Sequence, residues 1–440
     1  MCNINDENKI VSAAGNIRLI VENKHDIEKL VLSFPKIVQE IAPNVTLIQA
    51  VVKIDGDLNK DCIDELENKL IIQKNKINRQ PFITALGIER SRRTGNPAVD
   101  RNNKGLQDLP SKLKSKKSQP DRRSKVAAKI IKNYDPQQHP FPSDLVDIID
   151  NNFSSWLAVI HADGNDLGKH IRSLQLEKDF INEYKTFSAK LEISTINAAQ
   201  AAFKDHIHPK KNKAYPFRPV ILGGDDLTVI CRADLAIPFT KSFLKNFEIQ
   251  TFKHINKKIT ACAGISFVKV KYPFHYAIDL ANQLCTYAKK ISKEKYIQNK
   301  LAYVPSSIMF HKIQSSFIES FSDIKKRELK ADASNVDFCF GPYFIEKINS
   351  DLPTLEHLCS VVNECKNDDF PSTSLRQWLS ELHDNKNRAQ RLWERIIQVN
   401  ENFEKTLSQY HYKENNNKTI IYDALSYLSL CSKGGIECLN

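Results

Sequence analysis

The sequence predicts an α+β fold, with two ferredoxin-like domains of helices packed on a sheet and a mainly helical C-terminal domain. Three observations lead to this prediction. Strand-like runs alternate with amphipathic helices in the first hundred residues, a second alternation with a Gly-rich hairpin follows, and helical periodicity dominates near the C-terminus. We therefore expect domains at residues 1–100, 151–300 and 301–440, with a basic linker or loop at 101–150.

The N-terminal domain is predicted from an alternation of two periods. The expected elements are strands at Asn16 to Val21 and Val45 to Ile54, helices at His25 to Ile41 and Leu58 to about Ile77, and a strand at Phe82 to Leu86, with Asp57 as an N-cap. This β-α-β-α-β order is typical of a helix-on-sheet domain.

A basic segment follows, from Ser91 to Lys132. It has almost no aromatic residues and little periodicity before Val126, so we expect an exposed linker or long loop. Its basic residues include Arg92, Arg93, Lys104, Lys112, Lys114, Lys116, Lys117, Arg122, Arg123, Lys125 and Lys129. Two interpretations stay open: a solvated segment that keeps the protein soluble, or an electrostatic arm for RNA or DNA.

The region from about Phe153 to Lys290 carries the most information. A near-continuously apolar strand, Trp156 to Ala162, ends in the turn Asp163-Gly164-Asn165-Asp166-Leu167-Gly168-Lys169. The elements expected after it are a helix that includes Phe180 to Phe203, strands at Val220 to Leu222 and Leu227 to Cys231 around Gly223-Gly224-Asp225-Asp226, a helix capped by Asp234, a strand at Ile259 to Val268 and a helix at Phe274 to Lys290. This order predicts a palm-like β-α-β-β-α-β-α topology.

Three carboxylates can converge in this topology. Asp163 ends the first strand, and Asp225 and Asp226 lie at the tip of the hairpin beside it. Carboxylates that meet repel one another unless a cation lies between them, and hard oxygen ligands suit Mg²⁺ or Mn²⁺. Two such ions would activate a hydroxyl and stabilise a leaving pyrophosphate, which is phosphoryl or nucleotidyl transfer chemistry.

Glycines and lysines nearby suit a nucleotide. Gly164 and Gly168 allow a close backbone approach, and the helix that begins near Lys169 would point free N–H groups at a phosphate. Lys169, Lys289 and Lys290 could neutralise a triphosphate, and Gly223 and Gly224 leave room for a ribose or base. Each feature alone is commonplace in turns and helix ends, but their joint occurrence in this order favours a site.

These residues resemble a known family. HADGNDLGKH, GGDD, ACAGIS and the helix YPFHYAIDLANQLCTYAKK are similar to the catalytic palm of the type III CRISPR large subunit, a relative of the GGDEF diguanylate cyclases that produces cyclic oligoadenylates. The resemblance is good over about Trp156 to Lys290 and fainter over Ser91 to Ala98 and CFGPYFIEK. It implies a first, non-catalytic palm at 1–100. At 440 residues, the chain is expected by this resemblance to be a minimal, stand-alone form without the nuclease domain.

The resemblance also implies a role for each site residue. Asp163 and Asp225 would be metal ligands, and Asp226 a ligand or the proton acceptor for the attacking 3′-hydroxyl. Gly223 and Gly224 would line the nucleotide, the backbone of Gly164 to Gly168 would hold phosphates, and Lys289 would contact the β- or γ-phosphate. The family often has D-G-D-N where this chain has D-G-N-D, so the exchange of Asn165 and Asp166 weakens that metal site if its third position supplies a carboxylate. Ile171 at the position of a guanine-selecting Asn favours ATP over GTP.

Composition limits the remaining interpretations. The 440 residues suggest about three domains, and 41% hydrophobic and 26% charged residues exclude a wholly disordered chain. The net charge of +12 favours nucleic acid, nucleotides or phosphorylated ligands as partners. No long apolar run and no secretory signal occur, so we expect a cytoplasmic protein without membrane contact. The scattered Cys residues predict reduced thiols, and His206 with His208 predicts a surface turn rather than a metal site.

Three functions therefore stay open. The first is a Mg²⁺- or Mn²⁺-dependent nucleotidyltransferase that joins ATP into cyclic or short linear oligonucleotide messengers, in bacterial antiviral defence. The second is a catalytically weak palm that binds a nucleotide and serves as a scaffold or sensor in a defence complex, and the Asn165/Asp166 exchange motivates it. The third is a template-directed polymerase, which the lack of an obvious duplex-binding thumb disfavours. A homodimer or a defence-complex partner is compatible with each.

Overall fold

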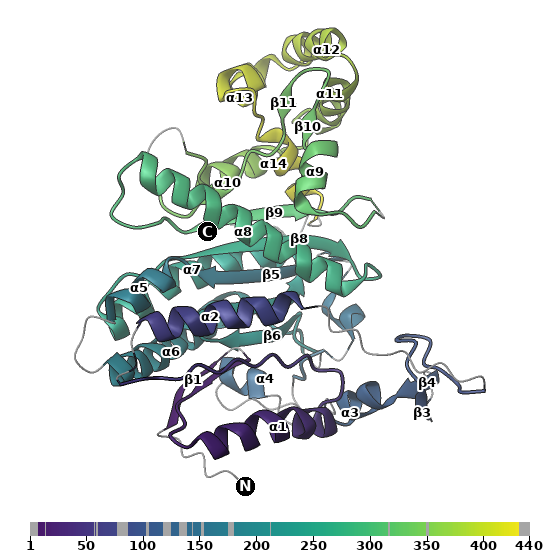
Figure 1. Cartoon of the computed structure of the whole chain (residues 1–440). Helices are drawn as coiled ribbons and strands as arrows, with labels where there is room; N and C mark the ends of the chain where they lie inside the picture. Colours follow the sequence, from purple (N-terminus) through teal and green to yellow (C-terminus); the bar gives the residue numbers. More distant parts are fainter. Residues whose placement is uncertain are drawn as a thin grey trace. The chain divides into compact units, whose positions relative to one another are not determined.

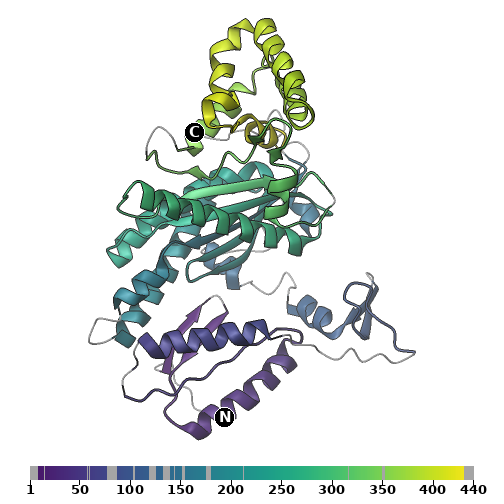
Figure 2. The same ribbon diagram turned by 45° about the horizontal axis from the view of Figure 1, so that its top comes forward.

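The structure is a computed structural model that divides the chain into two compact units (Figures 1 and 2). The N-terminal unit comprises Met1–Ser124 and Gly168–Ala189, and the C-terminal unit comprises Lys125–Leu167 and Lys190–Asn440. The residues described are 8–13, 15–56, 58, 60–76, 87–102, 105–117, 125–131, 139–142, 144–150, 154–174, 180–211, 213–315, 317–348 and 352–430.

The N-terminal unit begins with a hairpin and two long helices. Strands β1 (Lys9–Ala13) and β2 (Asn16–Leu19) pair antiparallel, and α1 (Lys24–Ile41) and α2 (Lys60–Asn75) follow. Asn23 caps α1 by accepting a hydrogen bond from the backbone N–H of His25 at 2.9 Å. The expected strand at Val45 to Ile54 is wrong, because no strand is assigned to these described residues. Asp57 and the strand predicted at Phe82 to Leu86 lie outside the described residues.

The basic segment contains more regular structure than a loop. Strands β3 (Ala98–Asn102) and β4 (Gly105–Asp108) form a hairpin, and the helices α3 (Leu109–Lys117) and α4 (Lys125–Ile130) follow. The buried Asp108 organises the segment: its carboxylate accepts from the Thr94 hydroxyl at 2.6 Å, the Asn96 amide at 3.0 Å and the Ser111 N–H at 3.0 Å. A fully linker-like segment is therefore wrong for its described part, because one buried acceptor joins loop, hairpin and helix.

The C-terminal unit is built on a six-stranded sheet with the order β12-β9-β8-β5-β7-β6. The strands are β5 (Trp156–Gly164), β6 (Phe217–Gly223), β7 (Asp226–Arg232), β8 (Ala261–Lys269), β9 (Ser307–Lys312) and β12 (Tyr343–Phe344). The connecting helices are α6 (Phe180–His206), α7 (Ala233–Ile255) and α8 (Phe274–Gln298). The central β5 pairs antiparallel with both β7 and β8, and β8–β9 is parallel. The β8-β5-β7-β6 core with its two crossover helices confirms the ferredoxin-like palm.

Helices cover both faces of this sheet. Helix α8 approaches β8 so closely that a Cβ on Gly264 would lie 2.1 Å from the carbonyl oxygen of Ala281. On the opposite face, the Phe217 ring contacts Phe203 of α6 at 5.3 Å and Phe239 of α7 at 5.0 Å between centroids. Glycine at position 264 thus sets the distance between α8 and the sheet.

The C-terminal region is helical, as predicted, with the bounds shifted. It contains α9 (Phe321–Arg327), α10 (Leu355–Glu364), α11 (Ser372–Asp384), α12 (Lys386–Val399), α13 (Glu404–Tyr410) and α14 (Ile421–Leu428), with the short strands β10 (Lys330–Ala331) and β11 (Val336–Asp337). Trp378 is fully buried and packs on Trp393 at 4.5 Å between ring centroids. Tyr427 of α14 contacts Phe267 of β8, so this region packs on the sheet.

Two sequence predictions can be compared with these coordinates. Cys231 and Cys262 carry free thiols and are buried in strands, as predicted. Among the helices that the structure describes, none combines the length and apolar character that a bilayer crossing requires.

Candidate active site

The first site carboxylate lies at the carboxyl end of the central strand. In β5, side chains alternate between the two sheet faces, so His161 and Asp163 share the face that α8 covers. Their partners on β8 are Gly264 and Cys262. Because β5 pairs with a strand on each side, the positions of these two polar side chains are fixed.

The other two carboxylates lie on the predicted hairpin. Strands β6 and β7 pair up to Gly223 and Asp226, which leaves Gly224 and Asp225 as a two-residue turn. Gly224 has a φ of +63°, as the first position of a type II′ turn requires. The Thr195 hydroxyl of α6 donates to the carbonyl of Gly224 at 2.6 Å and fixes the turn from the helix side.

The structure brings the three carboxylates together. The N–H of Gly164 donates to Oδ2 of Asp225 at 3.2 Å, and Asp225 also hydrogen-bonds with Asp163. His161, Asp163 and Asp226 can each present one ligand atom such that all three atoms lie within 4.8 Å of one another. A Cβ on Gly164 would lie 3.2 Å from Asp225, so this glycine allows the strand end and hairpin tip to meet.

Lys289 of α8 is the cation of this cluster. Its ammonium lies 2.5 Å from Oδ2 of Asp163 and donates to the carbonyl oxygen of Gly164 at 2.7 Å. The close packing of α8 on Gly264 positions this helix, and therefore Lys289, beside the end of β5. Lys290, the next residue, is exposed and makes no ion pair among the described residues.

Burial and mutual repulsion divide the charges of the cluster unequally. Burial raises the pKa of Asp225 to about 8, and the hydrogen bond and negative charge of Asp163 add to this effect. Burial and the charge of Asp163 raise the pKa of Asp226 to about 6. Burial would also raise the pKa of Asp163, but its hydrogen bond with Asp225 and the Lys289 ammonium outweigh burial and lower it. Without a metal ion, one lysine therefore compensates three carboxylates incompletely.

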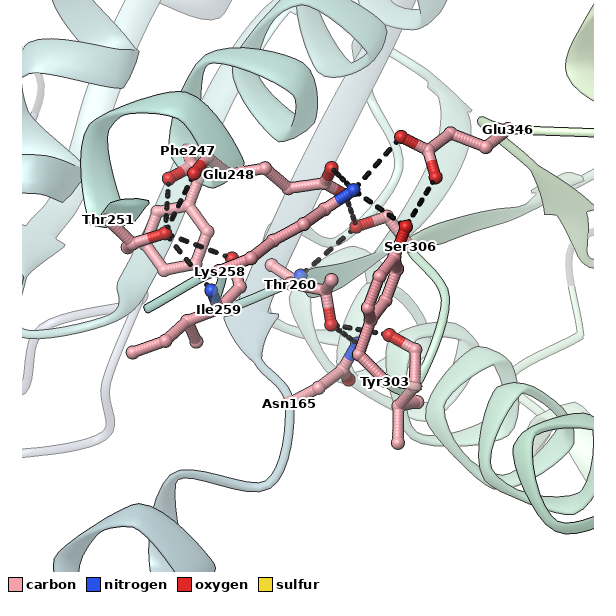
Figure 3. A network of polar contacts seen from close by, with 12 residues as sticks. Asn165, Phe247, Glu248, Thr251, Lys258, Ile259, Thr260, Tyr303, Ser306 and Glu346 are labelled. Atoms are coloured by element: carbon pink, nitrogen blue, oxygen red, sulfur yellow. Dashed lines mark hydrogen bonds and ion pairs between the residues drawn. The ribbon is translucent and has the colours of Figure 1, made fainter. Parts of the chain in front are cut away.

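Asn165 is bound within the fold and does not face the carboxylates. Its buried side-chain amide donates to the Thr260 hydroxyl at 3.0 Å, and its N–H donates to the Thr260 carbonyl at 2.8 Å (Figure 3). The Thr260 hydroxyl donates in turn to the carbonyl of Val304 at 2.6 Å. Asn165 thus ties the turn after β5 to the start of β8, a role that the sequence did not indicate.

The remaining predicted nucleotide contacts have different surroundings. The N–H groups of Gly164 and Asn165 already donate within the fold, so a phosphate would have to replace these hydrogen bonds to be held by these two groups. Asp166 has a φ of +54°. Gly168 and Lys169 lie in α5 (Leu167–Leu174) within the N-terminal unit, and their predicted phosphate contacts stay predictions.

His161 is the functional candidate that the sequence reasoning missed. Its Nδ1 lies 3.0 Å from the Thr228 hydroxyl, and burial lowers the pKa of the imidazole. The signal was present, because His161 and Asp163 stand two positions apart on one strand and must share a face. By contrast, His206 and His208 do not belong to the group of side chains that could hold a metal ion among the described residues.

The donor set fits a divalent cation. Carboxylate oxygens suit Mg²⁺ and Mn²⁺, and an added imidazole nitrogen shifts the preference toward Mn²⁺. The raised pKa values of Asp225 and Asp226 indicate negative charge that the protein alone does not compensate. A bound cation would supply that compensation.

Sequence comparison assigns this region to a family. Residues 156–301 match the profile described as Cas10/Cmr2, second palm domain. Residues 156–301 are therefore similar to a palm domain of the type III CRISPR large subunit. No curated protein matches the chain by sequence.

Solved structures with a similar arrangement are Csm1 proteins. The Csm1-Csm4 cassette in complex with cA3 has 11% sequence identity and a TM-score of 0.47, and the apo cassette has 12% and 0.46; each match covers 96% of this chain and 62% of that chain. Csm1 in T.onnurineus has 13% identity and a TM-score of 0.41 over the same shares. The chain thus spans about three-fifths of the length of these proteins.

Proposed function

We propose that the protein is a Mg²⁺- or Mn²⁺-dependent nucleotidyltransferase that joins ATP into cyclic or short linear oligonucleotides, as a messenger in bacterial antiviral defence. The observation that carries this proposal is the convergence of Asp163, Asp225 and Asp226 around the end of one strand, with Lys289 beside them. The Cas10/Cmr2 palm match over the same residues supports it.

Each residue of the cluster has a role in this reaction. Divalent cations held by Asp163, Asp225 and Asp226 would lower the pKa of an attacking 3′-hydroxyl and stabilise the leaving pyrophosphate. Asp226, whose pKa is about 6 in the metal-free protein, would accept the hydroxyl proton where it is not itself a metal ligand. With Asp163 as a ligand of a cation, the Lys289 ammonium would be free to contact a phosphate.

The substrate and partners follow from the same reasoning. Ile171 replaces the side chain with which guanine-specific relatives select their base, so ATP is the preferred substrate. The small residues Gly223 and Gly224 would line the nucleotide. RNA or DNA contact through the basic segment 91–132, and a homodimer or defence-complex partner, remain further predictions of this function.

A product assay tests the proposal. The protein is incubated with each nucleoside triphosphate and either Mg²⁺ or Mn²⁺, and the products are resolved by mass. We expect oligoadenylates from ATP, and a loss of product by about a thousandfold or more in the Asp225→Asn/Asp226→Asn variant. Asp279→Asn, an exposed change on α8, is the matched control. Equal product from the double variant and the control would contradict the proposal.

A second function is favoured by Asn165. Its amide is bound to Thr260, so the third position of the turn supplies no carboxylate to the cluster, as it would in a D-G-D-N turn. This arrangement suits a palm that binds ATP and signals its presence without chemistry. Calorimetry that shows ATP binding with no product, also when a defence-complex partner is added, would support this second function over the first.

A further inference from the structure

A cluster of positive charge surrounds an indole at the other end of β5. The ammonium of Lys269 lies 4.0 Å from the centroid of the Trp156 ring, and that of Lys312 lies 4.6 Å from the same centroid. Trp156 is the first residue of β5, Lys269 the last of β8 and Lys312 the last of β9. Three strand ends therefore gather two cations around one aromatic ring.

Lys258, a half-buried lysine in the same unit, has carboxylate partners of a kind that Lys269 and Lys312 do not have among the described residues. Lys258 also lies over a ring, that of Tyr303, but it pairs with Glu248 at 2.8 Å and with Glu346 at 3.0 Å (Figure 3). Across the described residues, no acidic side chain forms an ion pair with Lys269 or Lys312. An indole face compensates an ammonium only partly, by about 0.5–2 kcal/mol.

A third positively charged residue, Arg376, adds to the uncompensated positive charge near Lys312. Burial, together with the positive charges of Arg376 and Lys269, lowers the pKa of Lys312 to about 8. Burial also lowers the pKa of Lys269. Arg376 lies on the exposed side of α11. A bound anion would stabilise the charged form of the Lys312 ammonium, whose pKa the neighbouring positive charges lower.

Hydroxyl groups complete the surroundings of the two ammoniums. Lys312 donates to the hydroxyl of Ser429 at 2.6 Å, and Lys269 donates to that of Ser155 at 3.0 Å. Each ammonium has three donor hydrogens, so each keeps donors for a ligand. Phosphate oxygens accept such charge-assisted hydrogen bonds well.

We propose that Lys269 and Lys312 around Trp156 form a binding site for the phosphate group of a nucleotide or oligonucleotide, separate from the carboxylate cluster. Asp163 follows Trp156 by seven positions of extended strand, which is roughly 23 Å at 3.3 Å per residue. The proposal does not depend on the nucleotidyltransferase function, because the two sites share no residue and have opposite charge.

Lysine acetylation footprinting tests this site directly. The full-length protein is treated with an acetylating reagent in the presence of a metal chelator, and acetylation of each lysine is followed by mass spectrometry. The probes are sodium phosphate, ATP and a single-stranded uridine 20-mer. We expect Lys269 and Lys312 to react about tenfold more slowly when a binding probe is present at ten times its Kd. The exposed Lys386 and Lys405 serve as reference lysines whose rates stay unchanged.

The three probes separate the sources of phosphate. Protection by the RNA but not by ATP or phosphate supports the site with a strand as ligand. Protection by ATP or phosphate as well supports it with a small phosphorylated ligand. Equal acetylation of Lys269, Lys312, Lys386 and Lys405 with every probe would overturn the proposal.

A variant pair provides the second measurement. Lys269→Gln/Lys312→Gln should weaken binding of whichever probe protects the lysines by about tenfold, and for the RNA it should reduce the salt slope by roughly 1.4. Lys269→Arg/Lys312→Arg, which keeps the charge, should retain binding. Lys386→Gln/Lys405→Gln removes the same net charge elsewhere and should bind like the wild type. Identical affinities of the two Gln double variants, both folded by circular dichroism, would also overturn the proposal.

Discussion

The two ends of strand β5 carry opposite charges, and at each end the described neighbouring groups compensate the charge only in part. At the end with Asp163, three carboxylates face a single ammonium, and the pKa values of two of them are raised. At the end with Trp156, two ammonium groups gather with no ion-pair partner among the described carboxylates, and the pKa of Lys312 is lowered. In both places the protein keeps charges whose repulsion destabilises the free fold, and a ligand of opposite charge would relieve it. The comparison indicates that one strand connects a cation-binding end to an anion-binding end.

The largest expected effect comes from separating α8 from the sheet. In Gly264→Val, the new Cβ would lie 2.1 Å from the Ala281 oxygen and 2.3 Å from the Cys285 nitrogen, both backbone atoms. We expect a loss of unfolding free energy on the order of 3 kcal/mol, together with lost metal and nucleotide binding at the Asp163 end. Thermal unfolding and Mn²⁺ titration measure both effects. Gly168→Ala, where an added Cβ meets no atom within 4 Å, is the stability control.

The second-largest expected effect is a pH dependence of stability that comes from the carboxylates at the Asp163 end of β5. The pKa of Asp225 is about 8 in the folded protein against an ordinary value of 3.8, so the folded state holds this proton more tightly than the unfolded state. The metal-free protein should therefore lose stability as the pH rises from about 4 to about 8, by a few kcal/mol. Asp225→Asn should remove most of this loss. In the presence of a chelator at pH 9, the variant should therefore unfold at a higher temperature than the wild type.

Asp279→Asn, at an exposed position of α8, is the control for that experiment. A wild-type protein whose metal-free stability is the same at pH 5 and pH 9 would show that the carboxylates do not repel one another as described.

Asn165 offers a smaller and more specific change. In Asn165→Asp, a carboxylate would face the Thr260 hydroxyl, whose hydrogen is already donated to Val304. We expect a loss of about 1–3 kcal/mol of unfolding free energy and no gain in Mn²⁺ affinity, because the side chain points to Thr260. Tighter Mn²⁺ binding by this variant would show that position 165 reaches the metal site. Asn246→Asp, on the partly buried side of α7, provides a matched amide-to-acid control.

The smallest expected effect distinguishes the two proposed roles of Lys289, as the ion-pair partner of Asp163 and as a phosphate contact. In Lys289→Gln, the ammonium no longer competes for Asp163, so Mn²⁺ alone should bind about fivefold more tightly, while ATP in the presence of Mn²⁺ should bind about fivefold more weakly. Lys293→Gln, an exposed change one turn further along α8, should alter neither affinity. If both affinities change in the same direction, Lys289 does not alternate between carboxylate and phosphate.

The sequence predicted much of the acidic end, because its signals are local. Asp163 follows an apolar strand, and Gly223 to Asp226 form a turn whose glycine has the required positive φ. Strand alternation could also have identified His161. Asn165 could not be interpreted, because its partner Thr260 lies 95 residues away.

The cluster of Trp156, Lys269 and Lys312 was not predicted either, because its residues are also far apart in the sequence. Trp156, Lys269 and Lys312 come from three strands whose register only the folded sheet determines. Likewise, the hairpin and helix of the segment 91–132 depend on one buried carboxylate, that of Asp108, and not on periodicity.

The central claim is that Asp163, Asp225 and Asp226 hold divalent cations beside a nucleotide. A crystal structure with Mn²⁺ and a non-hydrolysable ATP analogue tests it most directly, because Mn²⁺ scatters anomalously. We predict anomalous peaks within coordination distance of the Asp163 and Asp226 carboxylates, with the triphosphate next to Lys289. Bound analogue with no anomalous peak at these carboxylates, or carboxylates that still bond only to each other and to Lys289, would contradict the claim.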